Sequence, residues 1–385
     1  MAKALKSIPS RLASLDILRG FDLFLLLFFQ PVLIAISQVA DIPFLNELSW
    51  HFDHEVWEGF RFWDLVMPLF LFMTGAAMPF LFAKYTTGKS QRDGLYWRIA
   101  RRVIVLFVFG MIVQGNLLAL DPNHIYIYTN TLQAIAIGYL IAAIILLSGG
   151  WKQQIIYTLA LLVIYTVPMI AIGDWTQEGN FAYKVDELIL GKFRGDTSYT
   201  WVWSSLTFGV TVMSGVFAGQ LLKSKNTKLK TVLTLLIIGV ALTAAGYALS
   251  PIVPIIKRIW TSSMTLFSSG LCFLLMAIFY WLIDCCGFSR GLNWLKVYGM
   301  NPITAYMLGE VINFRSIVSS VSFGLEPILG EYYSAWLTFG NFLILFLLLR
   351  FMYNQKIFLK VYLKHKSRKN KRMLVFLRSW RILKK

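Results

Sequence analysis

Charged residues are scarce in this 385-residue sequence, where Asp, Glu, Lys and Arg together make up only 15%. Hydrophobic residues make up 57%, and the aromatic residues include 30 Phe, 13 Trp and 17 Tyr. One soluble core cannot bury that much apolar surface, whereas a lipid bilayer accepts it. The low charge content therefore excludes an ordinary soluble chain and indicates an integral membrane protein with little soluble domain.

Cysteine and acidic residues are also few. The three cysteines, Cys272, Cys285 and Cys286, have the spacing of neither a disulfide framework nor a zinc site, and we expect no metal. The net charge of +18 comes from basic residues between apolar runs and at the C-terminus, which predicts cytoplasmic loops rather than a nucleic-acid surface. The sequence lacks a Walker loop, a dinucleotide-binding glycine pattern, HExxH and GxSxG, so no common soluble catalytic motif applies.

Several apolar runs reach the length of about 20 residues that crosses the hydrocarbon core of a bilayer. A lipid-exposed backbone must satisfy its own hydrogen bonds, so these runs should be helices. We predict an all-α polytopic membrane helix bundle of about ten transmembrane helices, or eleven, in one domain over residues 1–353. The candidate spans are Leu18–Val39, Phe60–Phe82, Arg102–Ala119, Thr131–Leu147, Gln154–Ile172, Ser204–Leu222, Thr231–Leu249, Trp260–Ile283, Tyr298–Val318 and Trp336–Met352.

Charge between the spans predicts the topology. Residues 41–60 carry five acids and no Lys or Arg, whereas the even-numbered links are basic and residues 354–385 hold twelve Lys or Arg and no acid. This pattern predicts that both termini are cytoplasmic, in a multi-pass protein of a bacterial inner membrane. The basic tail, residues 354–385, either lies on anionic membrane lipid or is a solvated anchor. Lys257 and Arg258 are the main exceptions, because they fall on the outer side.

Ionisable residues near the spans are the candidates for function, since a charge within a membrane is costly and usually faces a cavity or a partner. His54 is flanked by acids, including Asp53, at the outer entrance of the second span, and Asp64 should lie below the outer surface. Nearby acids can raise the pKa of a histidine or orient one ring nitrogen. Gln30 lies inside the first span. The alternative for His54 is a plain surface residue in an acidic loop.

Arg98, Arg101 and Arg102 cluster at the cytoplasmic start of the third span. The planar donor fork of arginine suits phosphate groups, although ordinary positive-inside bias explains the same cluster. Arg19 is three residues from Asp16, so the two can form a local ion pair on one helix face.

Amide side chains add polarity to two other spans. Asn130 and Gln133 begin the fourth span, and Asn301 precedes Pro302 in the ninth, where proline disfavours helical geometry in the residue before it. Helix packing and ligand contact explain these amides equally well.

At these clusters the chain resembles the heparan-α-glucosaminide N-acetyltransferase family of transmembrane acyltransferases. Four passages carry the resemblance: the Ser-Leu-Asp-x-x-Arg-Gly stretch within Arg11–Asp22, the His-x-x-Trp-x-Gly and Asp-Leu-x-x-Pro signature from His54 to Pro68, the passage Asn130–Tyr139, and the late segments Trp260–Asp284 and Gly299–Pro302. The second passage is the most specific.

The resemblance implies acetyl transfer from acetyl-CoA, as co-substrate, to an amino sugar or glycan acceptor at the outer face. It implies that the active-site histidine is His54. For the supporting catalytic roles we expect Asp53 or Asp64 to orient the imidazole and Gln30 to donate to the developing oxyanion. Family members often carry Asn where this chain has Gln30, and the large luminal extension of the human type is absent.

For the acetyl-CoA contacts, the candidates are Arg19, Arg98, Arg101, Arg102, Asn130, Gln133 and Asn301. The resemblance is also compatible with a homodimer. Two other functions remain open from the residues: an O-acetyltransferase of envelope glycans, and a sugar transporter or flippase without acyl transfer.

Overall fold

The computed structural model describes residues 12–83, 89–195 and 197–358. Arg11 and most of the predicted basic tail lie outside the described residues. The described residues form helices and connecting loops without a strand, which confirms the predicted all-α membrane bundle. The first half contains α1 (Ala13–Phe24), α2 (Gln30–Ala40), α3 (Pro43–His51), α4 (Val66–Phe82), α5 (Lys89–Val113), α6 (Thr131–Ser148), α7 (Trp151–Ile172) and α8 (Phe181–Leu190). The second half contains α9 (Ser205–Lys223), α10 (Lys228–Leu249), α11 (Ser262–Tyr280), α12 (Lys296–Met300), α13 (Pro302–Val311), α14 (Arg315–Ser322), α15 (Glu326–Leu329) and α16 (Tyr333–Asn354).

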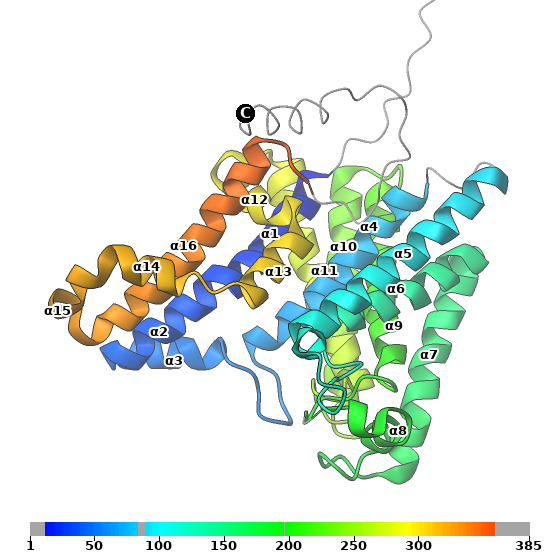
Figure 1. The fold of residues 1–385 in the computed structure, drawn as a ribbon. Coiled ribbons are helices and arrows are strands. Elements are labelled where there is room, and N and C mark those ends of the chain that lie inside the picture. Colours follow the sequence, from blue (N-terminus) through cyan, green and yellow to red (C-terminus); the bar gives the residue numbers. More distant parts are fainter. Residues whose placement is uncertain (1–11, 84–88, 196, 359–385) are drawn as a thin grey trace, which may run out of the picture.

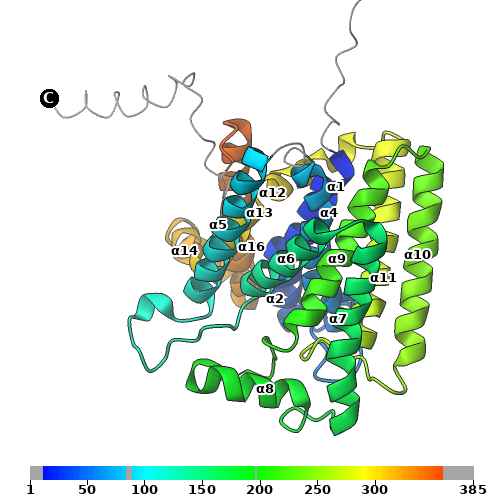
Figure 2. The ribbon, with the colours of Figure 1, turned by 90° about the vertical axis from the view of Figure 1, so that its right-hand side faces the viewer.

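The helices form two groups that meet along α1, α4 and α13 (Figure 1). The α9 group contains α4 to α7 and α9 to α11, with α10 beside α11 at its edge (Figure 2). The α1 group contains α1, α2, α12, α13 and α16. Helix α1 begins and α16 ends on the same side of the bundle, as expected for an even number of crossings (Figure 1).

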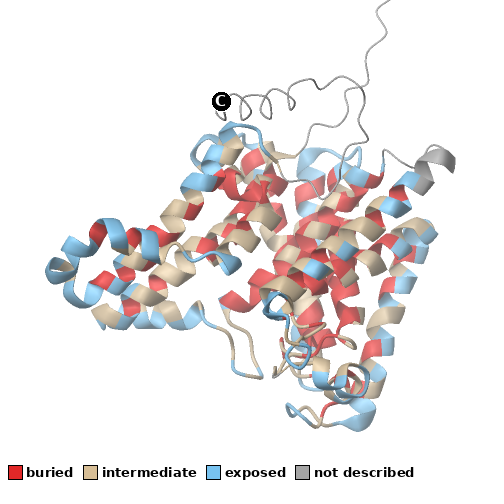
Figure 3. Ribbon diagram, viewed as in Figure 1, coloured by how far each residue is buried: buried red, intermediate tan, exposed pale blue. Residues whose placement is uncertain are grey.

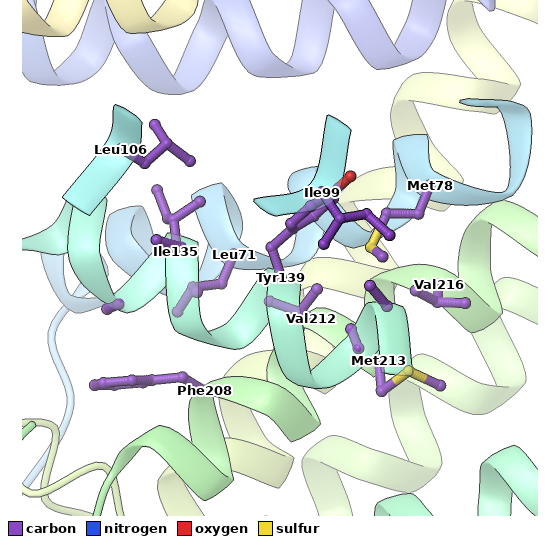
Figure 4. Close-up of a cluster of buried hydrophobic side chains, with 14 of the residues drawn as sticks. Leu71, Met78, Ile99, Leu106, Ile135, Tyr139, Phe208, Val212, Met213 and Val216 are labelled. Carbon is purple, nitrogen blue, oxygen red and sulfur yellow. The ribbon is translucent and has the colours of Figure 1, made fainter. Parts of the chain in front are cut away.

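The main core lies where α4, α5, α6 and α9 pack together, around residues such as Leu71, Tyr139 and Phe208 (Figure 4). Glycines let the backbones of α4 and α9 touch. A Cβ atom on Gly75 would lie 1.9 Å from the carbonyl oxygen of Val212, and one on Gly215 would lie 1.9 Å from that of Phe72. Small residues at such contacts are typical of helix packing in membranes, where van der Waals contact drives association.

Eight helical stretches of the described residues are long and apolar enough to cross a membrane. Their burial differs sharply. The most apolar windows of the stretches that contain α4 and α9 are each 78% buried, whereas those of α7 and α10 are 17% and 22% buried (Figure 3). The exposed faces of α7 and α10 are apolar, as at Ile164 and Val240. A bilayer rather than water suits those faces, and α4 and α9 form the centre of the bundle.

The ninth predicted span, Tyr298–Val318, is wrong as a single helix. It is divided into α12 and α13 at Asn301, whose backbone leaves the helical region before Pro302 starts α13. The chain is extended again at Ile312 before α14 begins. Proline explains the first break, since it lacks an N–H and restricts the residue before it.

The other spans agree with their helices apart from their ends. The third span corresponds to α5, which starts earlier and ends earlier than predicted. The helix ends before Asn116, which takes a left-handed conformation with φ 54°. The first span contains a π-helical segment, Leu25–Phe29, between α1 and α2. Such wide turns often occur at functional sites. The short helices α3, α8, α14 and α15 were not predicted.

We predict that Gly215→Ala destabilises the protein by about 1–3 kcal/mol, since the added methyl group forces α4 and α9 apart. Thermal unfolding of the detergent-solubilised protein measures the change. Gly94→Ala is the matched control, because a Cβ atom on Gly94 in α5 meets nothing within 4 Å. Equal melting temperatures for the two variants would contradict the close packing of α4 on α9.

Candidate functional site

The buried carboxylate of Asp64 organises the loop between α3 and α4. Asp64 lies in a 3-10 turn, Phe62–Leu65, that leads into α4. Its Oδ2 accepts hydrogen bonds from the backbone N–H groups of Arg61, at 3.0 Å, and Glu55, at 3.2 Å. The Arg61 side chain also donates to Glu55, with 2.9 Å between Nε and Oε2. These contacts fold the loop back on itself and fix the residues next to it.

His54 is held by the second oxygen of the same carboxylate. The Nδ1 atom of His54 lies 2.9 Å from Oδ1 of Asp64. The Asp64 side chain is completely buried, whereas 39% of the His54 side chain remains exposed. A buried carboxylate therefore orients an imidazole whose other edge is accessible, which is the usual arrangement of a catalytic histidine.

Lys257 completes the cluster from a distant part of the chain. Its Nζ lies 2.8 Å from Nδ1 of His54 and 3.3 Å from Oδ1 of Asp64, and its side chain is 7% exposed. The loop that carries Lys257 is joined to the His54 loop by an antiparallel bridge between Glu58 and Ile256.

Two further features fix the Lys257 loop. The backbone N–H of Gly59 donates to the Ile255 carbonyl at 2.9 Å, beside the bridge. On the other side of Lys257, Trp260 has φ 51°, a strained conformation for a bulky residue. Such outliers persist only where the surrounding structure holds them.

Only one hydrogen can occupy Nδ1 of His54, so only one of its two close contacts is a hydrogen bond at a time. If Nδ1 carries the hydrogen, it donates to Asp64 and Nε2 keeps a lone pair that can accept a hydrogen. If Lys257 donates to Nδ1, the hydrogen is on Nε2. The first arrangement is the one in which His54 can accept a proton from a ligand.

Burial and charge shift the proton equilibria of the two basic groups. Burial lowers the pKa of His54 below 6.5, with the nearby Lys257 acting in the same direction and Asp64 opposing both. Burial lowers the pKa of Lys257 to about 8, although the carboxylate of Asp64 opposes that change. The cluster therefore holds His54 in its neutral form near neutral pH.

The exposed edge of His54 faces a cavity of about 470 Å³. A cavity of this size is within the usual range of roughly 300–1,000 Å³ for small-molecule sites. Apolar walls come from α4, including Val66, Met67 and Phe70. Its polar lining residues are His54, Lys257, Gln114, Tyr126, Thr129, Thr131, Thr197, Tyr199, Tyr306 and Glu310. The site thus combines a positioned imidazole with a chamber that can hold a polar ligand.

Gln30 and Asp53 support the His54 loop from outside the cavity lining. The Gln30 side chain donates to the carbonyl of Phe52 at 3.3 Å, directly after the π-helical segment of the first span. Oδ1 of Asp53 accepts from the backbone N–H of His54 at 2.7 Å. Asp64 rather than Asp53 therefore contacts the ring itself.

Asn130 and Gln133 shape one wall of the cavity. Oε1 of Gln133 accepts from the backbone N–H groups of Thr129 and Asn130, at 2.9 and 3.1 Å. The Asn130 side chain caps α6 through Leu132 and donates to Gln114, a lining residue, at 3.0 Å. Both amides are completely buried, so they position the wall without lining it.

The remaining candidates lie apart from His54. Arg19 donates to the carbonyl of Met73 at 3.3 Å, and the Asn301 side chain donates to that of Ile357 at 2.9 Å. Arg98, Arg101 and Arg102 are on α5, where the Arg102 guanidinium lies 4.4 Å from the centre of the Tyr139 ring. None of these five candidates lines the cavity.

Lys257 is the site residue that sequence reasoning did not assign. Its one signal in the sequence was that Lys257 and Arg258 put positive charge on the predicted outer side, against the charge pattern of the other links. Nothing in the local sequence shows that it reaches His54, because the two residues are 203 positions apart. Among the described residues, no group of three or more His, Cys, Asp or Glu side chains could hold a metal ion.

Comparison with known proteins gives concordant matches. A family model described as "Heparan-alpha-glucosaminide N-acetyltransferase, catalytic" matches residues 11–232, more than half of the chain. The protein named heparan-alpha-glucosaminide N-acetyltransferase from Homo sapiens is 23% identical over 372 residues, covering 80% of this chain and 54% of the human protein. The protein of the same name from Mus musculus gives the same identity and coverage. The chain spans about half the length of these relatives.

We predict that Asp64→Asn destabilises the protein by about 3–5 kcal/mol, because it leaves the buried Lys257 cation without its carboxylate. Unfolding of the purified protein at neutral pH measures the loss. The double variant Asp64→Asn with Lys257→Met removes both charges and should recover most of the stability. A double variant no more stable than Asp64→Asn alone would contradict the pairing.

Proposed function

Because the chain belongs to the heparan-α-glucosaminide N-acetyltransferase family, we propose that it is a membrane acetyltransferase that acts on an amino sugar. The acetyl donor is acetyl-CoA from the cytosol, and transfer occurs at or near the outer face of a bacterial inner membrane. The observation that carries the proposal is His54, which is fixed by a buried carboxylate and opens onto a cavity between helices.

His54 is the general base in this proposal. With the Nδ1 hydrogen donated to Asp64, Nε2 accepts the proton that the sugar amine loses as its nitrogen attacks the thioester carbonyl. The carbon–sulfur bond then breaks, and the CoA thiolate leaves with the electron pair of that bond. The lowered pKa of His54 supports this role, since the ring is ready to accept a proton near neutral pH.

A second route uses the same ring as a nucleophile. Nε2 attacks the thioester and the CoA thiolate leaves. The acetylated imidazole then passes its acetyl group to the amine, and the released Nε2 accepts the proton that the amine loses. Both routes need a neutral His54 and the same orientation by Asp64. They differ in whether an acetylated enzyme accumulates when donor is supplied without acceptor.

The proposal assigns CoA phosphate contacts to Arg98, Arg101 and Arg102, with Arg19 as a further candidate. These arginines come from the predicted cytoplasmic ends of α5 and α1, while His54 is on the predicted outer side. The donor would be extended across the bundle, with its thioester near His54 and its phosphates near α5. In this arrangement the acetyl group crosses the membrane without transport of CoA.

Stabilisation of the developing oxyanion is assigned to an amide donor, for which Gln30 and Asn301 are the candidates. Neither amide lines the cavity, but Gln30 is bonded to the His54 loop through the Phe52 carbonyl and has a second amide hydrogen to donate. One preorganised donor of this kind contributes about 3–4 kcal/mol to the transition state.

We predict that His54→Ala lowers acetyl transfer by about 10²- to 10⁴-fold, the usual contribution of a general base. Mass spectrometry of the product from labelled acetyl-CoA and a panel of amino sugars measures the effect and identifies the acceptor. His51→Ala is the matched control, as it replaces an exposed histidine in the preceding helix, α3. Near-normal turnover in His54→Ala would exclude His54 as the base or nucleophile.

An O-acetylated product would replace the proposed function with O-acetyl transfer, and sugar movement without acetyl-CoA would replace it with transport.

We predict that Arg101→Gln with Arg102→Gln weakens CoA binding by about tenfold or more, the effect of losing one charged hydrogen bond of about 1.5–3 kcal/mol. Equilibrium binding of CoA to the purified protein measures the change. Lys230→Gln is the control, since it removes an exposed cation at the start of α10. Unchanged affinity in the double variant would remove the arginines from the donor site.

A further inference from the structure

We propose that Lys257 is a positioning residue whose ammonium group keeps His54 unprotonated and so available to react. The benefit to catalysis rests on the proposed function, because acetyl transfer requires an unprotonated His54 ring. The charge arrangement itself can be tested without any transfer reaction.

The geometry places a cation against the ring nitrogen that carries the hydrogen bond to Asp64. Nζ of Lys257 lies 2.8 Å from Nδ1 and 3.4 Å from Nε2 of His54. If the ring gained a second proton, two positive groups would be in contact in a site where Lys257 is almost completely buried. Like charges so close disfavour the charged form of either group.

Without Lys257, the contact with Asp64 would have the opposite effect. A histidine beside a buried carboxylate gains a partner for its charged form, and its pKa rises. Lys257 contacts the same carboxylate oxygen at 3.3 Å, so it neutralises the charge that would hold a proton on His54. Asp64 can thus orient the ring without keeping it protonated.

Other charged and titratable groups around the cluster do not replace Lys257. Asp53, on the same loop, favours the protonated ring. Arg258 is engaged with other groups, since its guanidinium donates to Ser198 and lies 5.7 Å from the centre of the Tyr199 ring. The other titratable groups that line the cavity are Tyr126, Tyr199, Tyr306 and Glu310. Lys257 is therefore the cation in contact with His54 among the described residues.

The test measures the proton equilibrium of His54 directly. Diethyl pyrocarbonate modifies neutral imidazole, and fragmentation of the resulting peptides locates the product at His54 and separates it from His51. The modification rate is measured across pH in the purified full chain for wild type, Lys257→Met and Lys257→Arg. Lys192→Met is the matched control, because Lys192 is an exposed lysine beside Phe193 that does not line the cavity.

The expected result is a midpoint below that of an ordinary histidine in wild type, with the same midpoint in Lys257→Arg and in the control. In Lys257→Met the midpoint should move to higher pH. At a fixed pH below both midpoints, the rate should fall about tenfold for each unit of displacement. The acid limb of acetyl transfer should move by the same amount, with activity recovering at alkaline pH.

An unchanged midpoint in Lys257→Met would overturn the proposal. This includes a result in which the modification rate changes by the same factor at every pH, because a purely structural role of Lys257 predicts that result. Lys257→Gln provides a second neutral variant if Lys257→Met does not fold. If the midpoint moves but neither the wild type nor any variant transfers acetyl groups, the proposed function is wrong, whereas the effect of Lys257 on the His54 ring is confirmed.

Discussion

The structure of the site depends on one buried carboxylate with four partners. Asp64 receives two backbone N–H groups on Oδ2, and its Oδ1 faces both His54 and Lys257. An ionised carboxylate without partners would be too costly to bury, so the loop, the imidazole and the ammonium must come together for the chain to fold here. The same contacts that compensate the buried charge of Asp64 therefore orient the His54 ring.

The helix bundle supplies the rigid support for this cluster. Glycine contacts bring α4 against α9, and Asp64 lies in the turn that starts α4. The outer helices α7 and α10 turn apolar faces outward, where the surrounding lipid covers them. A loop anchored to one of the two central helices can hold an imidazole in place while its exposed edge faces a cavity.

Much of this arrangement could be predicted from the sequence, because its signals are local. Long apolar runs identified the spans, and the spacing of His54 and Asp64 around Gly59 placed both at one helix entrance. The division of the ninth span could be predicted in part, because Pro302 disfavours helical geometry at Asn301, although the span was still expected as one helix. Lys257 could not be placed at all, because its contact with His54 depends on two loops pairing across the fold, and a hydropathy pattern carries no information on such pairing.

The position of Lys257 in the chain has a consequence for biosynthesis. The matched catalytic stretch ends at residue 232, yet the cation that contacts His54 comes later, just before α11. A nascent chain that has inserted its first helices holds the imidazole and the carboxylate but not the ammonium. The contact between Lys257 and His54 can form only after α10 and the following loop have been synthesised, so a truncated or split protein must retain that loop to keep this contact.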